Sequence, residues 1–80
     1  MKIKIFFFGI TTDLVGNNKL EIIVEEGTSV AKLKTVLKQK YKSLKNIDSY
    51  AIAVNEEYAK DDLILEKNDI VAIIPPVSGG

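Results

Sequence analysis

The chain has 80 residues, of which 46% are hydrophobic, and eleven lysines balance eleven acidic residues with no histidine and no cysteine. This length gives one small domain, and the hydrophobic content is too high for a disordered chain. The absence of cysteine and histidine excludes disulfides, a thiolate nucleophile and the commonest metal ligands, so we expect no bound metal. The balanced charge argues against a nucleic-acid partner, and the lack of a signal peptide or a long apolar run predicts a cytoplasmic protein without a membrane partner.

The first predicted strand, Ile3 to Phe8, has two different faces. Alternation places three apolar side chains on one face and a mixed set on the other, namely Ile3, Ile5 and Phe7 against Lys2, Lys4, Phe6 and Phe8. A short helical turn over 10–15 and a Gly-Asn-Asn turn signal at 16–18 lead to a second strand over 19–24. These segments predict a hairpin with a long connection.

One long helix is predicted from about Ser29 to Tyr41, with Thr28 or Ser29 as its N-cap. Apolar residues recur there at helical spacing, at Val30, Leu33, Val36, Leu37, Tyr41 and Leu44. Six lysines and no acid lie between Lys32 and Lys45. We interpret Lys34, Lys38, Lys42 and Lys45 as a solvated helix flank, with contact to an acidic partner as the alternative.

The second half of the chain predicts three more strands, over 50–54, over 58–59 and over 70–74. The unbroken apolar run Ile70 to Ile74 is typical of a strand in the middle of a sheet that is buried on both faces. The element order therefore predicts an α+β fold with two layers, in which one main helix packs on one face of a mixed sheet of four to five strands. With the last strand parallel to the first, this is the β-grasp, or ubiquitin-like, arrangement.

Two prolines separate this domain from its last residues. Proline has no N–H for a sheet ladder, so we expect Ile74 to be the last strand residue and Pro75-Pro76 to form a stiff stem. The prediction is a domain over 1–76 and a flexible Gly-Gly tail over 77–80. The tail ends in glycines that fit narrow channels, so the Gly80 carboxylate is the most accessible reactive group.

The segment Ala53-Val54-Asn55, together with a terminal Pro-Pro-Val-Ser-Gly-Gly, resembles the small subunit of molybdopterin synthase, a sulfur carrier of molybdenum-cofactor synthesis. The resemblance covers essentially the whole chain. Two departures stand out. Asn68 occupies a position where the family often has glycine, although asparagine also tolerates positive φ. The segment 9–13 lacks the basic residue that many members carry there.

The resemblance implies a carrier that binds no cofactor and is inactive alone, being the sulfur-donating subunit of a two-subunit sulfurtransferase. An adenylyltransferase similar to ubiquitin-activating enzymes would use ATP to adenylate Gly80, and a sulfur donor protein would then give a thiocarboxylate. The large synthase subunit, in a heterotetramer, would pass the sulfur to a cyclic pyranopterin monophosphate. The implied site residues are Gly80 as the reacting group, Gly79, Ser78 and Val77 for insertion, and Phe6, Phe8, Ile74, Pro75 and Pro76 for partner binding.

Several alternatives stay open at this stage. The carrier could serve thiamine synthesis or tRNA thiolation, the chain could be a protein modifier joined to lysines through Gly80, or it could be an adaptor with an inert tail. Phe6 and Phe8 could be partly covered by the segment 10–15 instead of forming a partner patch. The acidic residues Glu56, Glu57, Asp61, Asp62 and Glu66 indicate turn solubility, with docking to the activating enzyme as the alternative.

Overall fold

The structure is a computed structural model that describes residues 1–76, so the predicted flexible tail over 77–80 lies outside the described residues. The strands are β1 (Lys2–Phe7), β2 (Lys19–Ile23), β3 (Ala51–Val54), β4 (Glu57–Tyr58) and β5 (Ile70–Ile74). The helices are α1 (Ile10–Val15), α2 (Val30–Lys40) and two short 3₁₀ turns, η1 (Lys42–Leu44) and η2 (Ile47–Ser49).

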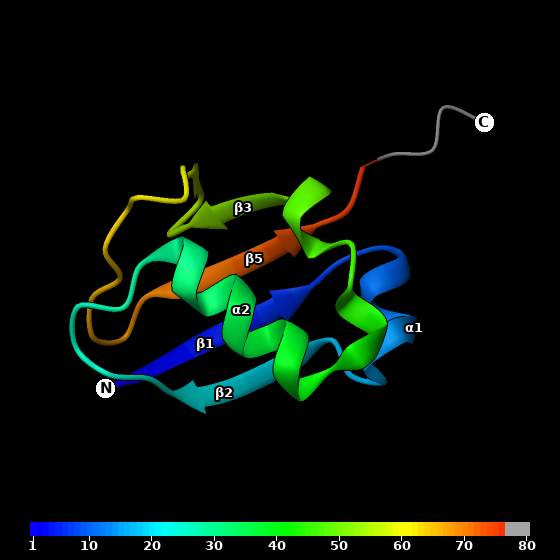
Figure 1. Cartoon of the computed structure of the whole chain (residues 1–80), viewed down its shortest axis with the longest axis horizontal. Helices are drawn as coiled ribbons and strands as arrows, with labels where there is room; N and C mark the ends of the chain where they lie inside the picture. The colour runs from blue at the N-terminus through cyan, green and yellow to red at the C-terminus, as the bar shows by residue number, and fades with distance from the viewer. Residues whose placement is uncertain (77–80) are drawn as a thin grey trace.

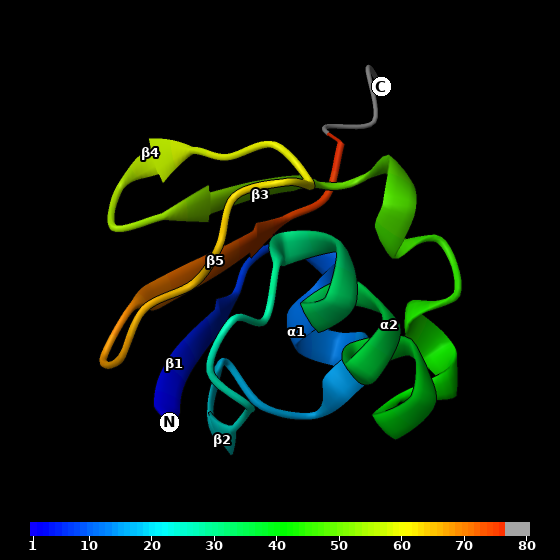
Figure 2. The same ribbon diagram turned by 60° about the vertical axis from the view of Figure 1, so that its left-hand side comes forward.

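The five strands form one mixed sheet in the order β2-β1-β5-β3-β4. β5 runs parallel to β1, with Ile5 opposite Val71, and antiparallel to β3, with Ile52 opposite Ile73. Helix α2 crosses one face of this sheet, while α1 lies beyond the end of β1 and beside η1 (Figures 1 and 2). The predicted α+β arrangement of one main helix on one face of a mixed sheet is confirmed.

The core fills the space between the sheet and α2. Alternate residues of each strand point into it, and the apolar stripe of α2 faces them. Its fully buried members include Ile3, Ile5, Val30, Leu33, Leu37, Leu44, Ile47, Val71 and Ile73. Burial of this apolar surface is what stabilises so small a domain.

Strand β5 occupies the centre of the sheet, as predicted, but only one of its faces is buried. Val71 and Ile73 point into the core and are fully buried. On the other face Ile70 is 45% exposed, and Ala72 and Ile74 are half-buried. The prediction of burial on both faces is therefore wrong, because a single helical layer covers the described sheet and the opposite face of β5 reaches the surface.

Helix α2 confirms the predicted span to within one residue at each end. Ser29 is its N-cap, and the Ser29 Oγ accepts a hydrogen bond of 3.1 Å from the Lys32 backbone N–H. Tyr41 is the C-cap, and its ring meets the Phe7 ring edge-on with centroids 6.4 Å apart. The helix end is therefore tied to the first strand.

The β3–β4 turn is held by a polar contact to the start of β5. The turn residues Asn55 and Glu56 both have positive φ, at 51° and 71°. The Asn55 Nδ2 donates to the buried Asp69 carboxylate at 2.9 Å, and the Asn55 Oδ1 accepts from the Ile70 N–H at 3.0 Å. Asn68 also has positive φ, at 69°, which bears out the expected tolerance of asparagine at that turn.

Two glycine substitutions in this turn should have opposite effects on stability. Asn55→Gly keeps the backbone relaxed but removes both side-chain hydrogen bonds, so we expect the free energy of unfolding to fall by about 1–3 kcal/mol. Glu56 has φ 71°, which is a strained conformation for a residue other than glycine. Relief of this strain in Glu56→Gly should exceed the entropic cost of glycine, so we expect the free energy of unfolding to rise by about 0.5 kcal/mol. Urea denaturation of the two variants checks this, and equal effects of the same sign would contradict the assigned role of Asn55.

Candidate functional site

The sheet face opposite α2 carries a row of apolar side chains. Phe6 of β1 lies opposite Ala72 of β5, Ala72 lies opposite Ala53 of β3, and Ala53 lies opposite Tyr58 of β4. Residues paired across strands share a face, so these four side chains form one continuous strip. Its outer end is Tyr58, which is 80% exposed.

A second row lies where β1 and β5 end. The Phe8 N–H donates to the Ile73 carbonyl at 3.2 Å and so continues the ladder past β1, and the Phe8 side chain is 50% exposed. Ile74 of β5 is half-buried and lies opposite the exposed Ala51 of β3. We define the outer apolar face as Phe6, Phe8, Ala51, Ala53, Tyr58, Ala72, Ile74 and Pro75. Phe8, Ala51 and Tyr58 are exposed, Ala53 is buried, and the other four residues are half-buried. Partly exposed apolar surface of this kind is a candidate docking site, and this one reaches the point where the chain leaves the sheet.

The predicted partner-binding residues come together on this face. Phe6, Phe8 and Ile74 lie on adjacent strands, and the chain then passes through the half-buried Pro75 to the exposed Pro76. Phe8 is 50% exposed and Phe6 is half-buried, so the alternative of partial cover by residues 10–15 stays open. A role in partner binding remains a prediction for these five residues. The predicted reacting and inserting residues, Val77, Ser78, Gly79 and Gly80, lie outside the described residues.

The sheet ladder ends where the prolines predict. Ile74 pairs with Ala51 and is the last residue of β5. Pro75 and Pro76 have no N–H to continue the pairing. The stem therefore leaves the middle of the sheet and not an edge, and Pro75 and Pro76 continue past the end of β5 (Figures 1 and 2).

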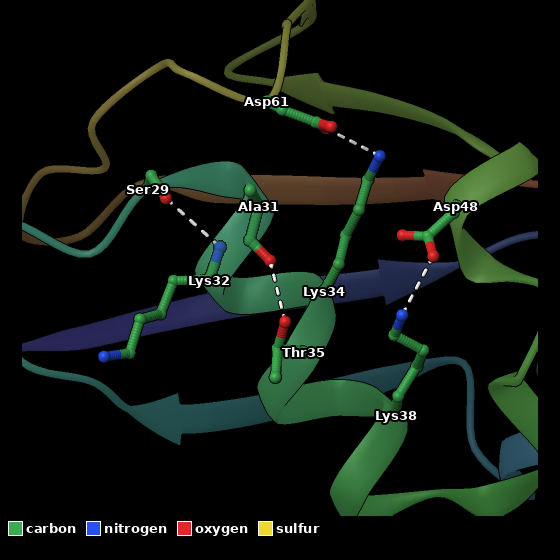
Figure 3. Close-up of polar contacts among 8 residues, drawn as sticks. All are labelled: Ser29, Ala31, Lys32, Lys34, Thr35, Lys38, Asp48 and Asp61. Atoms are coloured by element: carbon green, nitrogen blue, oxygen red, sulfur yellow. Dashed lines mark hydrogen bonds and ion pairs between the residues drawn. The ribbon is translucent and has the colours of Figure 1, made fainter.

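The lysine flank of α2 is partly engaged in contacts within the domain (Figure 3). Lys34 is only 7% exposed, and its Nζ donates to the Asp61 carboxylate at 2.7 Å. The prediction that Lys34 is solvated is therefore wrong, since a loop 27 residues further along the chain covers it. Lys38 bonds Asp48 at 2.8 Å, and this hydrogen bond holds the pKa of the Asp48 carboxyl below its ordinary value.

The remaining charged residues of these two regions face solvent. Lys42 and Lys45 are exposed, as predicted for the helix flank. In the acidic stretch Asp61 is paired with Lys34, and the other four acids are exposed, namely Glu56, Glu57, Asp62 and Glu66.

Within residues 1–76 no group of three or more acidic side chains lies close enough to hold a metal ion. No helix in the described part of the chain is long and apolar enough to cross a membrane.

Sequence reasoning missed two features of this region. The buried Asp69 receives hydrogen bonds from Asn55 and, at 2.8 Å, from the Glu66 backbone N–H. Gly9 lies against Pro75, a contact between the two ends of the chain. A glycine directly after a strand indicates a turn with positive φ. This signal in the sequence does not tell which residue the glycine contacts.

The sheet order, the single covering helix and the central last strand define a ubiquitin-like β-grasp domain. A structure from Haloferax volcanii, SAMP1, shares this fold with a TM-score of 0.89 at 20% identity, covering all of both chains. The ThiS family model matches residues 5–80. The chain therefore belongs to the ThiS family.

Three similar proteins have names that refer to molybdopterin. A molybdopterin synthase sulfur carrier subunit of Arabidopsis thaliana is 36% identical over 81 residues, covering 100% of this chain and 84% of the relative. A putative molybdopterin converting factor subunit 1 from Pyrococcus furiosus has a TM-score of 0.88 at 30% identity, covering 96% of this chain and 99% of that one. A complex of subunits 1 and 2 of molybdopterin-converting factor from Helicobacter pylori contains a chain with a TM-score of 0.71 and 26% identity, with full coverage of both. The resemblance to molybdopterin synthase small subunits is confirmed.

Proposed function

We propose that this chain is the sulfur-carrier small subunit of molybdopterin synthase. The observation that supports it most is full-length similarity to sulfur carrier subunits, combined with a Pro-Pro-Val-Ser-Gly-Gly ending after a central strand. The described domain contributes no histidine or cysteine. Its chemistry therefore resides in the Gly80 carboxylate, and the domain presents that group to partner enzymes.

The proposed activation turns an unreactive carboxylate into an electrophile. The Gly80 carboxylate attacks the α-phosphate of ATP in an adenylyltransferase, and pyrophosphate leaves. The terminal sulfur of a persulfide on a donor protein displaces AMP, and a thiol cleaves the sulfur–sulfur bond to leave Gly80 as a thiocarboxylate. The large subunit then transfers this sulfur to a cyclic pyranopterin monophosphate. ATP is thus used by the activating partner and is not a cofactor of this chain.

The outer apolar face is the proposed docking surface for the large subunit. It is continuous with the stem, so one binding event would cover Phe8 and Ile74 and guide residues 77–80 toward the partner's active site. The Helicobacter pylori complex of subunits 1 and 2 supports a large-subunit partner.

We propose a heterotetramer of two small subunits on a large-subunit dimer, which sedimentation of the mixed subunits tests directly. The cytoplasmic location stays a prediction.

Reconstitution tests the function itself. The chain is prepared with a C-terminal thiocarboxylate and mixed with a large subunit and cyclic pyranopterin monophosphate. We expect dithiolene product in proportion to the thiocarboxylate consumed. Failure to form product, with the thiocarboxylate intact and the subunits bound, would count against a role in molybdopterin synthesis and favour a carrier for thiamine or tRNA thiolation. An adaptor with an inert tail would show binding but no dependence on the thiocarboxylate.

A further inference from the structure

We propose that Gly9 and the turn around it form a buttress that sets the position of Pro75, and thereby the direction in which the chain passes into residues 77–80. The inference rests on the proposed function and adds to it a positioning residue at the opposite end of the chain. Gly9 touches no reacting atom. Its role would be exerted through Pro75.

The contact itself is close. A Cβ placed on Gly9 would lie 3.1 Å from the Pro75 Cγ and 3.8 Å from its Cδ. Such a separation is tighter than ordinary van der Waals contact, so one of the two residues would have to move. Gly9 also has φ 56° and ψ −139°, a conformation open to glycine and rarely adopted by other residues. Two independent features therefore favour glycine beside the stem.

The turn that carries Gly9 is firmly attached to the sheet. The Phe8 N–H donates to the Ile73 carbonyl at 3.2 Å, two residues before Pro75. The Phe8 carbonyl accepts from both the backbone N–H and the hydroxyl of Thr11, whose side chain is fully buried. The Thr12 hydroxyl donates to the Phe7 carbonyl at 3.0 Å. One hydrogen bond thus ties the turn to β5 and three local ones hold its shape, so the turn offers a defined surface to the proline ring.

The stem, by contrast, has few other means of being held. Pro75 and Pro76 have no N–H, so the ladder that fixes β5 stops at Ile74. Packing of the Pro75 ring beside Gly9 is then a restraint on the path of the chain as it leaves the sheet. A side chain at Gly9 would displace the proline ring by a few tenths of an ångström. Because placement of a reacting group to within about 1 Å governs the rate of group transfer, we expect a change in the direction of the stem to lower the rate at Gly80.

The test compares Gly9→Ala with Gly16→Ala as a matched control. Gly16 has φ 86° with no atom within 4 Å of an added Cβ, so its substitution strains the backbone without approaching the stem. Thermal unfolding should show both variants folded, with the larger loss of stability for Gly9→Ala, because ψ −139° at positive φ is less accessible to alanine than the left-handed conformation of Gly16. Two more variants are prepared, namely Pro75→Ala and the double variant Gly9→Ala/Pro75→Ala. All four variants are thiocarboxylated and assayed for sulfur transfer at saturating large subunit.

We expect Gly9→Ala to lower the maximal transfer rate at least about tenfold and Gly16→Ala to change it less than about twofold. Pro75→Ala removes the Cγ and Cδ that an alanine at Gly9 would meet, so the double variant should transfer sulfur within about threefold of Pro75→Ala alone. A wild-type rate for folded Gly9→Ala, or no recovery in the double variant, overturns the proposal.

A second readout does not depend on sulfur chemistry. In the NMR spectrum of the wild-type chain we expect a nuclear Overhauser effect between the Gly9 Hα and the Pro75 ring, and a shift of the Val77 amide in Gly9→Ala but not in Gly16→Ala. Absence of the Overhauser effect, or an unchanged Val77 amide, overturns the buttress even if transfer is active. If the wild-type chain transfers no sulfur while these signals are present, the proposed function fails and the buttress stands on the NMR result.

Discussion

Deletion of Gly80 is expected to abolish sulfur transfer and leave the stability of the domain unchanged. The hydrophobic core is formed by residues between Ile3 and Ile73, so removal of the last glycine takes no apolar surface from it. The reactive carbon is the terminal carboxyl, and loss of one residue moves it by about 3.5 Å along an extended chain. Misplacement of about 1 Å already costs roughly 100-fold in rate, so we expect a loss well beyond that.

The deletion is measured in the reconstituted synthase assay with chemically thiocarboxylated chains. Thermal melts and sedimentation with the large subunit serve as controls, because a folded and bound deletion variant isolates the chemical step. An extension by one glycine provides the matched change in the other direction and should be equally inactive. Full transfer by the deletion variant at unchanged stability would falsify the assignment of Gly80 as the sulfur-bearing residue.

The second large effect concerns the outer apolar face. Phe8→Glu places a charge where the proposed interface meets the stem, next to Ile74, and should weaken binding to the large subunit by about 10- to 100-fold. The Phe8 side chain is 50% exposed in the free domain, so the substitution should leave the fold intact. Isothermal titration of the large subunit measures the affinity.

Ile23→Glu is the matched control for this substitution. Ile23 points to the same side of the sheet but lies on β2, far across the sheet order from β3 and β4, and is 71% exposed. The same change of chemistry there should alter the affinity by less than about threefold. Equal losses in both variants would indicate a general effect of charge, and no loss in Phe8→Glu would show that the large subunit binds elsewhere.

Local patterns in the sequence were sufficient to predict the five strands, the helices α1 and α2, and their order, but not the 3₁₀ turns η1 and η2, which fall in a segment predicted as a connection. The helix was predicted from residue 29 to residue 41, and the structure has Ser29 as N-cap and Tyr41 as C-cap. The prolines predicted the end of the last strand at Ile74. These signals lie within a few residues of the feature that they determine, which is why sequence alone carries them.

Features that depend on distant parts of the chain were not predictable in the same way. A run of five apolar residues does not distinguish a strand buried on both faces from one with an exposed face, and β5 is of the second kind. Lys34 is buried because the loop containing Asp61 folds over it. Gly9 meets Pro75 only once β1 and β5 lie side by side. In each case the determining partner lies far away in sequence.

Only part of the candidate site was predictable from the sequence, because pairing between distant strands brings its other residues together. Alternation along β1 placed Phe6 and Phe8 on the face away from the helix, and the structure adds Ala53, Tyr58 and Ala72 to that face through cross-strand pairing. The reacting residue Gly80 was predicted from the Gly-Gly ending and from the family resemblance.

The most direct test of the central claim is the intact mass of the chain after incubation with an adenylyltransferase, ATP and a persulfide donor. The account predicts that one oxygen is replaced by one sulfur, that fragmentation places this sulfur on Gly80, and that omission of ATP prevents the change. An unchanged mass with an enzyme that activates a known carrier would contradict it. Mass increases that correspond to other proteins joined through Gly80 would instead identify a protein modifier.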